Sequence, residues 1–425
     1  MACTHRFTRP FFWIVCLAVL QFTVSCDTLT LNGIAGNITS DGLALSDVAI
    51  TAVSQNGTVY TSETDTSGRY AIGGMEPGTY IITPAKSGFT FTPAAIETDV
   101  PIQGGKDNLN FQATPEDKIK VVLTGDINLG TNVGKLIRDR ENGDYTFPFR
   151  HLSSYLSSAD LTIGNLESII SDKGSCTKLI WGIPLRAAPE AVNGLLYAGF
   201  DMLGVANNHI GDYDFEGMED SLDRIKAAGM IYAGGGKNFE EAHTPAIKTV
   251  NNTRIALLAY TNVPMYMDST GPYSPTPKWI AREDRPGTAW AHDTRFDMYG
   301  DLDQMTTDII KAKSMADIVI VSVHFGWERN KKPDENQIEL AHKAIDAGAS
   351  LVVGHHPHVT QPVEIYKGKY IAYSLGNFIF DMTGDDDYTK GMIIEATILD
   401  GQIIEVQEIA TRINDDYQVE FRDTL

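Results

Sequence analysis

The spacing of hydrophobic residues changes near residue 118. Between residues 28 and 113, short alternating runs of hydrophobic and polar residues are separated by turn residues about every eight to twelve positions. This spacing predicts a small antiparallel β-sandwich. The segment contains no histidine, and no polar group recurs in a way that indicates a site. The predicted strands are VAITAV, TVYTSETD, RYAIGG, GTYIITPAK and FTFTP.

From Lys118 onward, short continuous apolar runs alternate with amphipathic helical stretches. Buried strands alternating with helices predict an α/β fold with both faces of the sheet covered. ATPEDK (113–118) reads as a polar linker before this domain, and the segment 262–300 reads either as a long insertion or lid or as an irregular surface loop. The predicted strands are KVVLTG, ADLTIG, FDMLGVA, RIALLAY, ADIVIVSV, SLVVG and KYIAYSL, and the predicted helices are PEAVNGLLYAG, FEGMEDSLDRIKAAG, LDQMTTDIIKAKSM and ENQIELAHKAIDAGA.

Composition limits the classes of partner. The 425 residues are too many for one ordinary core and indicate two or three domains. The formal net charge of −21 repels nucleic acid and anionic lipid headgroups, which argues against a nucleic-acid partner. It does not exclude an anionic substrate that is held by local metal ions.

The first 26 residues have the layout of a secretory signal, with two arginines, a 15-residue largely apolar run and then Cys26. The run is shorter than the roughly 20 residues of a bilayer span. TVSC (23–26) resembles a bacterial lipobox, with threonine where leucine is usual. We therefore expect a lipidated Cys26 and an extracytoplasmic, membrane-anchored protein of the cell envelope. An uncleaved anchor and an ordinary cleavage site are the alternatives. Acylation of Cys26 would leave Cys176 without a disulfide partner.

Five predicted strands of the α/β domain end in side chains that can bind metal or move protons. In open α/β sheets, ligands bind just beyond the carboxyl ends of the strands. If these strands are neighbours and parallel, one pocket collects all of these groups. They are Asp126 and Asn128; Asn165 and Glu167; Asn207, Asn208 and His209; His324 and Glu328; and His355, His356 and His358.

These residue types suit a particular metal chemistry. Carboxylate, amide oxygen and imidazole together favour Mn, Fe, Zn or Co, and the absence of thiolates excludes a structural Cys-type zinc site. A glutamate carboxylate can bridge two ions about 3.5–4 Å apart, which activate water for hydrolysis. In GHHPH (354–358), an extended backbone would point His356 and His358 to the same side as paired ligands.

Each of these residues alone also has a structural interpretation, as a turn former, a helix cap or a surface charge. The joint pattern at five strand ends favours a site. Four other histidines lack such support, and we assign them to packing or to the surface: His151, His243, His292 and His342.

The motifs GDINLG (125–130), GNLES (164–168), ANNHIGD (206–212), HFGWE (324–328), GHHPH (354–358) and YSLGNFIFD (373–381) together resemble the bacterial capsule-synthesis CapA family. That family is associated with poly-γ-glutamate capsules and is similar to the calcineurin-type metallophosphatases. The resemblance runs in order over nearly all of residues 118–400. TDTSGRYAIGGMEPGTYIITPAKSGFTFTP resembles the carboxypeptidase regulatory-like, transthyretin-type β-sandwich, which implies a non-catalytic spacer or adhesion module.

The metallophosphatase resemblance implies roles for individual residues. His355 falls at the variable position before His-Pro-His and is expected to be a neighbour rather than a ligand. Asn128 replaces a histidine, and Glu167 is one methylene longer than the usual bridging aspartate. The implied metal ligands are Asp126, Glu167, Asn208, His324, His356 and His358, and His209 is the implied proton donor to the leaving group.

We therefore expect a CapA-type protein of capsule or poly-γ-glutamate biogenesis with a metal-dependent hydrolase-like domain over residues 118–425. One or two divalent ions (Mn, Fe or Zn) would polarise a phosphoryl or carbonyl oxygen, and His209 would act as general acid. The expected partners are an anionic polymer, phosphoester or γ-glutamyl substrate and a membrane polymer-synthesis complex. The alternatives are a non-catalytic assembly factor and a generic metallophosphoesterase. Four further residues are expected to contact substrate or orient the ligands: Asn128, Asn165, Glu328 and Asn377.

Overall fold

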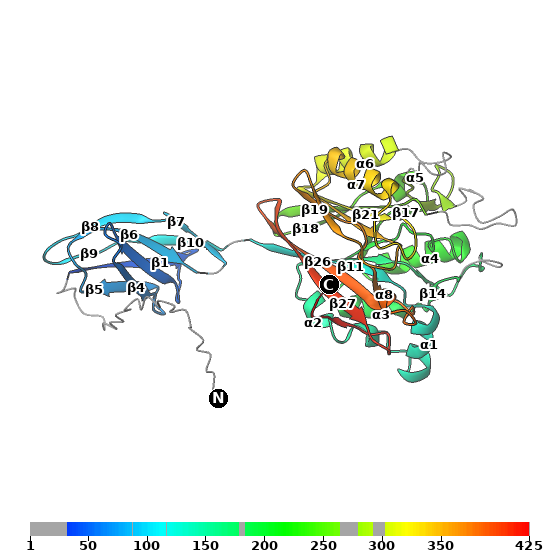
Figure 1. Cartoon of the computed structure of the whole chain (residues 1–425), viewed down its shortest axis with the longest axis horizontal. Helices are drawn as coiled ribbons and strands as arrows, with labels where there is room; N and C mark the ends of the chain where they lie inside the picture. Colours follow the sequence, from blue (N-terminus) through cyan, green and yellow to red (C-terminus); the bar gives the residue numbers. More distant parts are fainter. Residues whose placement is uncertain are drawn as a thin grey trace, which may run out of the picture. The chain divides into compact units, whose positions relative to one another are not determined.

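The chain forms two compact units, which divide between Asp117 and Lys118 (Figure 1). The predicted signal segment with Cys26, the residue His292 and much of the segment 262–300 lie outside the described residues. Within the described ranges, no helix is both long enough and apolar enough to cross a membrane. The computed structural model describes residues 32–424 except 87, 116, 178–182, 264–278 and 292–301.

The N-terminal unit is all-β, as predicted. Its strands alternate between buried and exposed residues, so that Tyr80 and Ile82 of β6 (Gly78–Ala85) enter a core that also holds Ile34 and Phe111. One sheet contains β2 (Leu43–Ala44), β1 (Gly33–Ser40), β10 (Phe111–Pro115) and β7 (Phe89–Thr92), with β5 (Arg69–Gly73) and β9 (Gly105–Lys106) paired to β1. The other sheet has the order β4 (Val59–Glu63), β3 (Ala49–Ser54), β6 and β8 (Ile96–Val100).

Two details of this unit differ from the expectation. Strand β1 pairs in parallel with both β9 and β10, so the sheet is mixed rather than antiparallel. Strand β10 continues to Pro115, so residues 113–115 of the expected linker belong to a strand. The sequence did not indicate this end of the strand, because ATPEDK is mostly polar and its one buried residue in β10 is the small Ala113. Which sandwich family the unit belongs to stays a prediction.

The C-terminal unit contains two large sheets. The first has the order β16 (Ile231–Ala233), β15 (Met202–Gly204), β12 (Leu161–Leu166), β11 (Ile119–Ile127), β26 (Lys390–Leu399), β27 (Gln402–Ile413) and β28 (Val419–Phe421), with β25 (Asn377–Ile379) paired to β11. The second has the order β18 (Ala246–Val250), β19 (Thr253–Thr261), β21 (Ile318–His324), β22 (Leu351–His355), β24 (Lys369–Ala372) and β23 (Val363–Tyr366). Two small pairs join β13 (Ile169–Ile170) to β14 (Arg186–Ala187) and β17 (Gly235–Gly236) to β20 (Gly287–Thr288).

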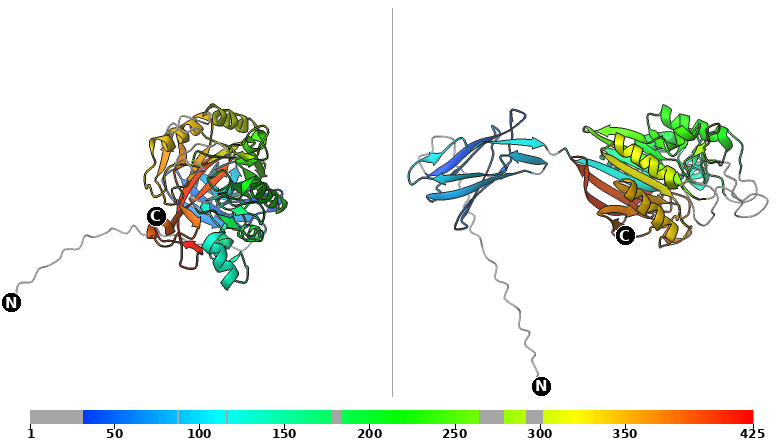
Figure 2. Two further views of the ribbon diagram at one scale, coloured as in Figure 1. Left: turned by 90° about the vertical axis from the view of Figure 1, so that its right-hand side faces the viewer. Right: turned by 90° about the horizontal axis from the view of Figure 1, so that it is seen from above.

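The two large sheets pack against each other, and helices cover their outer faces. Val121 and Ile163 of the first sheet share one buried cluster with Leu257 and Ile320 of the second. In Figure 1, α6 and α7 lie on one side of the strands and α1, α2 and α3 lie on the other, and the view turned about the vertical axis keeps this layering (Figure 2, left). The helices are α1 (Thr131–Arg140), η1 (Phe147–Phe149), α2 (Ser153–Leu156), α3 (Ala191–Ala198), α4 (Asp214–Ala227), α5 (Phe239–His243), α6 (Leu302–Met315), α7 (Glu335–Ala347) and α8 (Asp386–Thr389).

The layered α/β architecture is therefore confirmed, and both faces of each sheet are covered, as expected. Each sheet has helices on one face only, because its other face is covered by the second sheet. The sequence could not show whether helices or a second sheet cover a given face, since a strand buried by a sheet and a strand buried by helices have the same apolar composition.

Helix α7 shows how the fold positions strand ends. Asp334 and Gln337 form a capping box at its start, and Gly348 ends it with φ +117°. The helix carries the chain from the end of β21 back to the start of β22, so the two strands run parallel and His324 pairs with His355. In the first sheet, β11 and β12 also run parallel, so that Asp126 at the end of β11 pairs with Asn165 at the end of β12.

Candidate metal centre

Asp126 lies at the centre of the candidate site and is fully buried. One carboxylate oxygen, Oδ1, accepts a hydrogen bond from Asn165 Nδ2 at 2.8 Å and lies 3.0 Å from His355 Nδ1. The other, Oδ2, lies 3.4 Å from His358 Nδ1. Burial alone would raise the pKa of Asp126, but the hydrogen bonds and charges of His355 and His358 hold it well below the ordinary value.

Glu167 is the second fully buried carboxylate, and three imidazoles surround it. Its Oε1 atom lies 3.5 Å from His324 Nε2, 3.7 Å from His358 Nε2 and 3.9 Å from His209 Nε2. Its backbone N–H donates to the carbonyl of Ile127, the last residue of β11, at 2.9 Å. This bond fixes Glu167 directly beside the end of the strand that carries Asp126.

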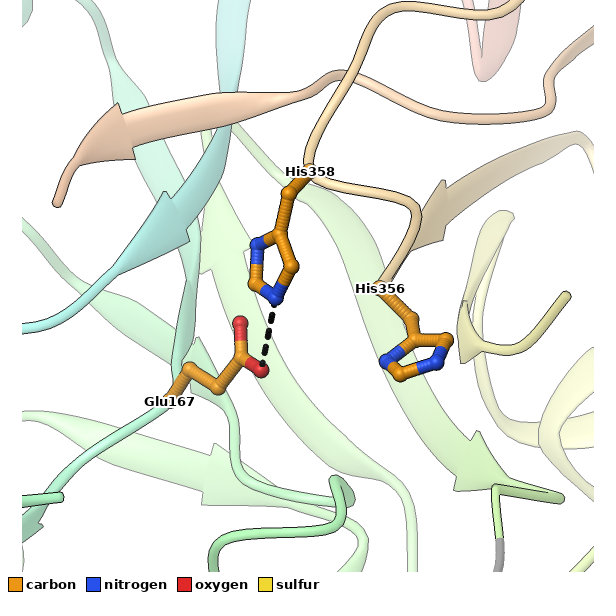
Figure 3. A group of neighbouring side chains, drawn as sticks. All are labelled: Glu167, His356 and His358. Carbon is orange, nitrogen blue, oxygen red and sulfur yellow. Dashed lines mark ion pairs between the residues drawn. The ribbon is translucent and has the colours of Figure 1, made fainter. Parts of the chain in front are cut away.

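His356 and His358 project from one loop toward Glu167 (Figure 3). Their rings lie 6.0 Å apart, and both residues are almost completely buried. The extended backbone that we expected here is wrong, because His356 has φ +96° and His358 has φ +57°. Two left-handed residues turn the loop, and that turn brings both rings to the same side. Such a conformation costs a residue with a Cβ on the order of 1 kcal/mol or more, and strain of this kind concentrates at functional sites.

Asn377 orients His358. The Oδ1 atom of Asn377 lies 2.8 Å from His358 Nδ1, while its Nδ2 donates to the carbonyl of Tyr388 at 2.9 Å. Burial would lower the pKa of His358, but the negative charge of Glu167 and the hydrogen bond and charge of Asp126 raise it to about 10. A metal ion that binds His358 therefore has to displace a proton.

His324 lies between Asn165 and Asn208. Its Nδ1 atom is 3.4 Å from Asn165 Nδ2, and its Nε2 atom is 2.8 Å from Asn208 Oδ1. Burial and the nearby positive charge of His356 lower the pKa of His324 well below its ordinary value. The ring is therefore neutral, which is the form that a metal ligand requires.

His209 is partly exposed and pairs with Asp212. Its Nδ1 atom lies 2.7 Å from Asp212 Oδ2, which leaves Nε2 facing Glu167. Asp212 is buried, and the same Oδ2 atom accepts a hydrogen bond from the backbone N–H of Leu185 at 2.7 Å. Asn207 shapes the turn, because its Oδ1 atom accepts from the His209 N–H at 3.1 Å.

The structure brings most of the sequence-predicted residues together but leaves two apart. The side chain of Asn128 bonds locally, accepting from the Gly130 N–H at 2.9 Å and donating to Thr131 Oγ1 at 3.0 Å in the turn before α1. Glu328 is exposed in the loop after β21. The histidines assigned to packing or to the surface contact other groups, since His243 pairs with Asp308 at 2.7 Å and His342 lies 3.0 Å from a Glu364 oxygen.

Asp212, which was not predicted at the site, contacts His209. Asn207 and His355 were predicted at the strand ends without a role as ligands, and they contact His209 and Asp126. Asp212 was detectable in ANNHIGD (206–212), where a carboxylate three residues after a histidine can bond to the ring within one turn. His355 was named only as a neighbour of the ligands, and its contact with Asp126 joins two residues that are 229 positions apart.

The buried donors form two overlapping groups that could hold a metal ion. One comprises Asp126, Glu167 and His324, and the other comprises Glu167, His356 and His358. Within each group, the ligand atoms lie within 4.8 Å of one another. Buried carboxylate and neutral imidazole are donors that suit a borderline divalent ion, and the shared Glu167 is placed to contact both positions. The residues therefore fit one or two such ions.

A family described as "Bacterial capsule synthesis protein PGA_cap" matches residues 120–382, which is more than half of the chain. The chain belongs to this family. The matched residues include both groups of candidate metal donors and also His209, Asp212 and Asn377.

Curated proteins are also similar to this chain. "Capsule biosynthesis protein CapA" of Bacillus anthracis is 36% identical over 271 residues, 62% of this chain and 60% of the relative. "PGA biosynthesis protein CapA" of Bacillus subtilis is 32% identical over 267 residues, 63% of this chain and 64% of the relative. A "Probable polyglutamine synthesis accessory protein" of Mycobacterium tuberculosis is 27% identical over 337 residues, 70% of this chain and 86% of the relative. The chain thus spans somewhat under two thirds of the length of the two Bacillus relatives.

Proposed function

We propose that this protein is a metal-dependent hydrolase-like member of the capsule synthesis family that acts in the biogenesis of capsular poly-γ-glutamate or a related anionic polymer. One observation carries the proposal: Glu167 Oε1 lies within 3.9 Å of ring nitrogens of His209, His324 and His358 at an edge where both sheets end. A structural role alone does not explain why four ionisable side chains are collected here, three of them almost completely buried, because burying charge is costly.

Each residue has a distinct part in the proposed chemistry. One or two divalent ions held by Asp126, Glu167, Asn208, His324, His356 and His358 would supply a Lewis acid that polarises a phosphoryl or carbonyl oxygen. His209 presents Nε2 to the same space, and Asp212 orients the ring because its Oδ2 atom lies 2.7 Å from Nδ1. His209 would therefore give its proton to the leaving group.

The polymer context rests on the relatives. Two Bacillus proteins named for capsule and PGA biosynthesis and a Mycobacterium protein named as a probable polyglutamine synthesis accessory protein are similar to this chain. An anionic polymer also agrees with a site whose histidines and bound metal ion would offset the two buried carboxylates, in contrast to the acidic charge of the whole chain.

We further propose an extracytoplasmic location at the cell envelope, with Cys26 as the lipidated anchor. The support is the sequence of the first 26 residues, which has a basic start, a short apolar run and a lipobox-like TVSC. Growth with radiolabelled palmitate tests this directly. Wild-type protein should carry label, and Cys26→Ser should not.

The metal proposal is tested by elemental analysis of the purified chain. We expect one or two equivalents of Mn, Fe or Zn, and we expect His356→Ala and His358→Ala each to lower that content. His342→Ala is the matched control, because His342 lies on α7 and pairs with Glu364 away from the site. A wild-type protein that holds no metal, and takes up none on dialysis, contradicts the proposal.

A second candidate is a non-catalytic assembly factor of a membrane polymer-synthesis complex. The word "accessory" in the name of the Mycobacterium relative supports it. His209→Ala separates the two candidates, because His209 is the proposed proton donor and is partly exposed, so its loss should leave the fold intact. Polymer production that stops in this variant favours chemistry, and unchanged production favours the assembly role. Assays of phosphoesters and γ-glutamyl peptides with Mn²⁺ would identify a generic metallophosphoesterase.

A further inference from the structure

Arg329 is attached to the loop that carries two of the candidate ligands. It lies in the exposed connection between β21 and α7, and its backbone N–H donates to the carbonyl of Pro357, between His356 and His358, at 2.9 Å. The backbone of Arg329 is left-handed, with φ +69°. This conformation is uncommon for a residue with a Cβ and persists where the surroundings hold it in place.

The side chain of Arg329 is also fixed. Its Nε atom donates to the hydroxyl of Tyr388, and its guanidinium carbon lies 5.1 Å from the centroid of that ring. The Tyr388 ring in turn lies 6.4 Å from the ring of His358 and is 3% exposed. One aromatic ring therefore separates the guanidinium from a candidate metal ligand.

Unlike the neighbouring lysines, Arg329 has no carboxylate partner within ion-pair distance among the described residues. Lys331 pairs with Asp387 at 2.6 Å, and Lys390 pairs with Asp386 and with Asp387. Across the described part of the chain, no carboxylate lies within ion-pair distance of Arg329, whose side-chain contact is a neutral phenol. Glu328 and Asp385 act on it only through longer-range attraction.

A guanidinium that is held at Nε still has both terminal nitrogens for a ligand. These nitrogens form a planar fork that matches the two oxygens of a carboxylate or phosphate. A lysine would offer a point charge with no such geometry. The arrangement at Arg329 thus combines a fixed position, an uncompensated charge and a location beside the donor cluster.

We propose that Arg329 binds an oxyanion of the substrate at the rim of the candidate metal centre and so selects for anionic substrates. This inference rests on the proposed function, because it places the anion beside the same site. The oxyanion would be a free α-carboxylate along a γ-linked glutamate chain or a phosphoryl group, which share two oxygens at similar spacing.

Binding of two probes to the full chain tests the proposal without requiring turnover. Inorganic phosphate and a γ-linked hexaglutamate are titrated by calorimetry against wild type, Arg329→Gln, Arg329→Lys and the control Arg140→Gln. Arg140 is 71% exposed at the end of α1, where it pairs with Asp416. We expect Arg329→Gln to weaken binding of one probe about tenfold or more, Arg329→Lys to weaken it less, and Arg140→Gln to leave it unchanged. The probe that responds identifies the oxyanion.

A purely structural role is distinguished by Tyr388→Phe, which removes the hydroxyl that accepts from Arg329 but keeps the guanidinium. Direct binding predicts a smaller loss of affinity in Tyr388→Phe than in Arg329→Gln. Equal losses in the two variants, unchanged binding in Arg329→Gln, or no binding of either probe to wild type would each overturn the proposal. Metal content and hydrolysis are measured separately, so Arg329-dependent binding without hydrolysis would refute the proposed chemistry and retain this inference.

Discussion

His355 Nδ1 lies 3.0 Å from Asp126 Oδ1 in the buried centre of the α/β domain. The contact joins the ends of β22 and β11, which belong to different sheets. His355 thereby fixes the carboxylate that the candidate metal centre is built around, while its neighbours His356 and His358 face Glu167. A histidine that bonds to a ligand, rather than to the ion, usually raises affinity by holding the ligand in place.

We therefore predict that His355→Ala keeps the metal stoichiometry and weakens metal affinity by roughly 10- to 100-fold. Competition with a chelator of known affinity measures the change. His342→Ala, on the exposed side of α7, should bind metal like wild type. A stoichiometry that falls as it does in His356→Ala would mean that His355 is itself a ligand.

Asp212→Asn should change the protonation of His209 without removing metal. The aspartate oxygen that accepts from Nδ1 lies 2.7 Å away, and an asparagine amide can instead donate to that atom. The proton would then move to Nε2 of the neutral ring. Nitrogen chemical shifts of labelled histidine report the tautomer, and we expect the Nε2–H form of the neutral ring to increase, with metal content constant. Asp214→Asn is a nearby control. A tautomer ratio equal to wild type would contradict the proposed positioning.

Gly125→Ala should disturb the site through the backbone. A Cβ at Gly125 would lie 2.1 Å from the carbonyl oxygen of Gly376, which accepts the Asp126 N–H at 3.0 Å. The added methyl group must push β11 away from the segment that carries Asn377, at a cost of roughly 1–3 kcal/mol. Thermal unfolding and metal titration should both show the loss. Gly384→Ala is the matched control, because no heavy atom lies within 4 Å of its added Cβ, and equal effects in the two variants would refute the argument.

Asp220 predicts a pH dependence of stability. It is 10% exposed on α4 and lies 2.7 Å from Lys173 Nζ, 2.6 Å from Ser171 Oγ and 2.7 Å from Arg224 Nε. Burial would raise its pKa, but these three partners lower it to about 2. Because this folded value lies below the unfolded value of about 3.9, the carboxylate stabilises the fold above pH 4, by roughly 2 kcal/mol, and the contribution is lost as the pH falls toward 2.

Urea unfolding of wild type and Asp220→Asn between pH 7 and pH 3 measures this contribution. The difference in free energy of unfolding should be largest at pH 7 and should shrink below pH 5. Asp223→Asn on the same helix is the control, since Asp223 is 60% exposed in its pair with Lys237 and should contribute little. If the difference in free energy of unfolding instead grew as the pH fell, the pKa of Asp220 would be raised rather than lowered by folding, which would contradict the prediction.

The sequence predicted the regular parts of the fold because their signals are local. The apolar run ADIVIVSV lies in β21, and the helical stretch ENQIELAHKAIDAGA gives α7. The division into two sheets was not predictable from such runs, since a buried strand looks the same whichever layer covers it. The C-terminal hairpin of β26 and β27 was also missed, because its partner strand β11 lies about 270 residues earlier in the sequence.

Some features of the candidate site could likewise be predicted from the sequence, and others could not. His324, His356 and Glu167 could be named from their places at the ends of strands, and they lie together. The left-handed turn at His356 and His358 could not be predicted, because no local sequence signal indicates a positive φ at a histidine. Asn128 was expected near the site, yet its side chain bonds within its own turn, which is a common alternative for asparagine.

The donors of the candidate site are spread along the chain from Asp126 to His358, and they come from both sheets. A nascent chain that has not yet reached Ser350 has made both buried carboxylates, Asp126 and Glu167, but lacks the His356 and His358 rings that face them. Burying these carboxylates without the histidines would cost free energy, so this part of the domain is not expected to form a stable folded core by itself. Folding of the domain is therefore expected to wait for the ribosome to finish β22 and the loop after it.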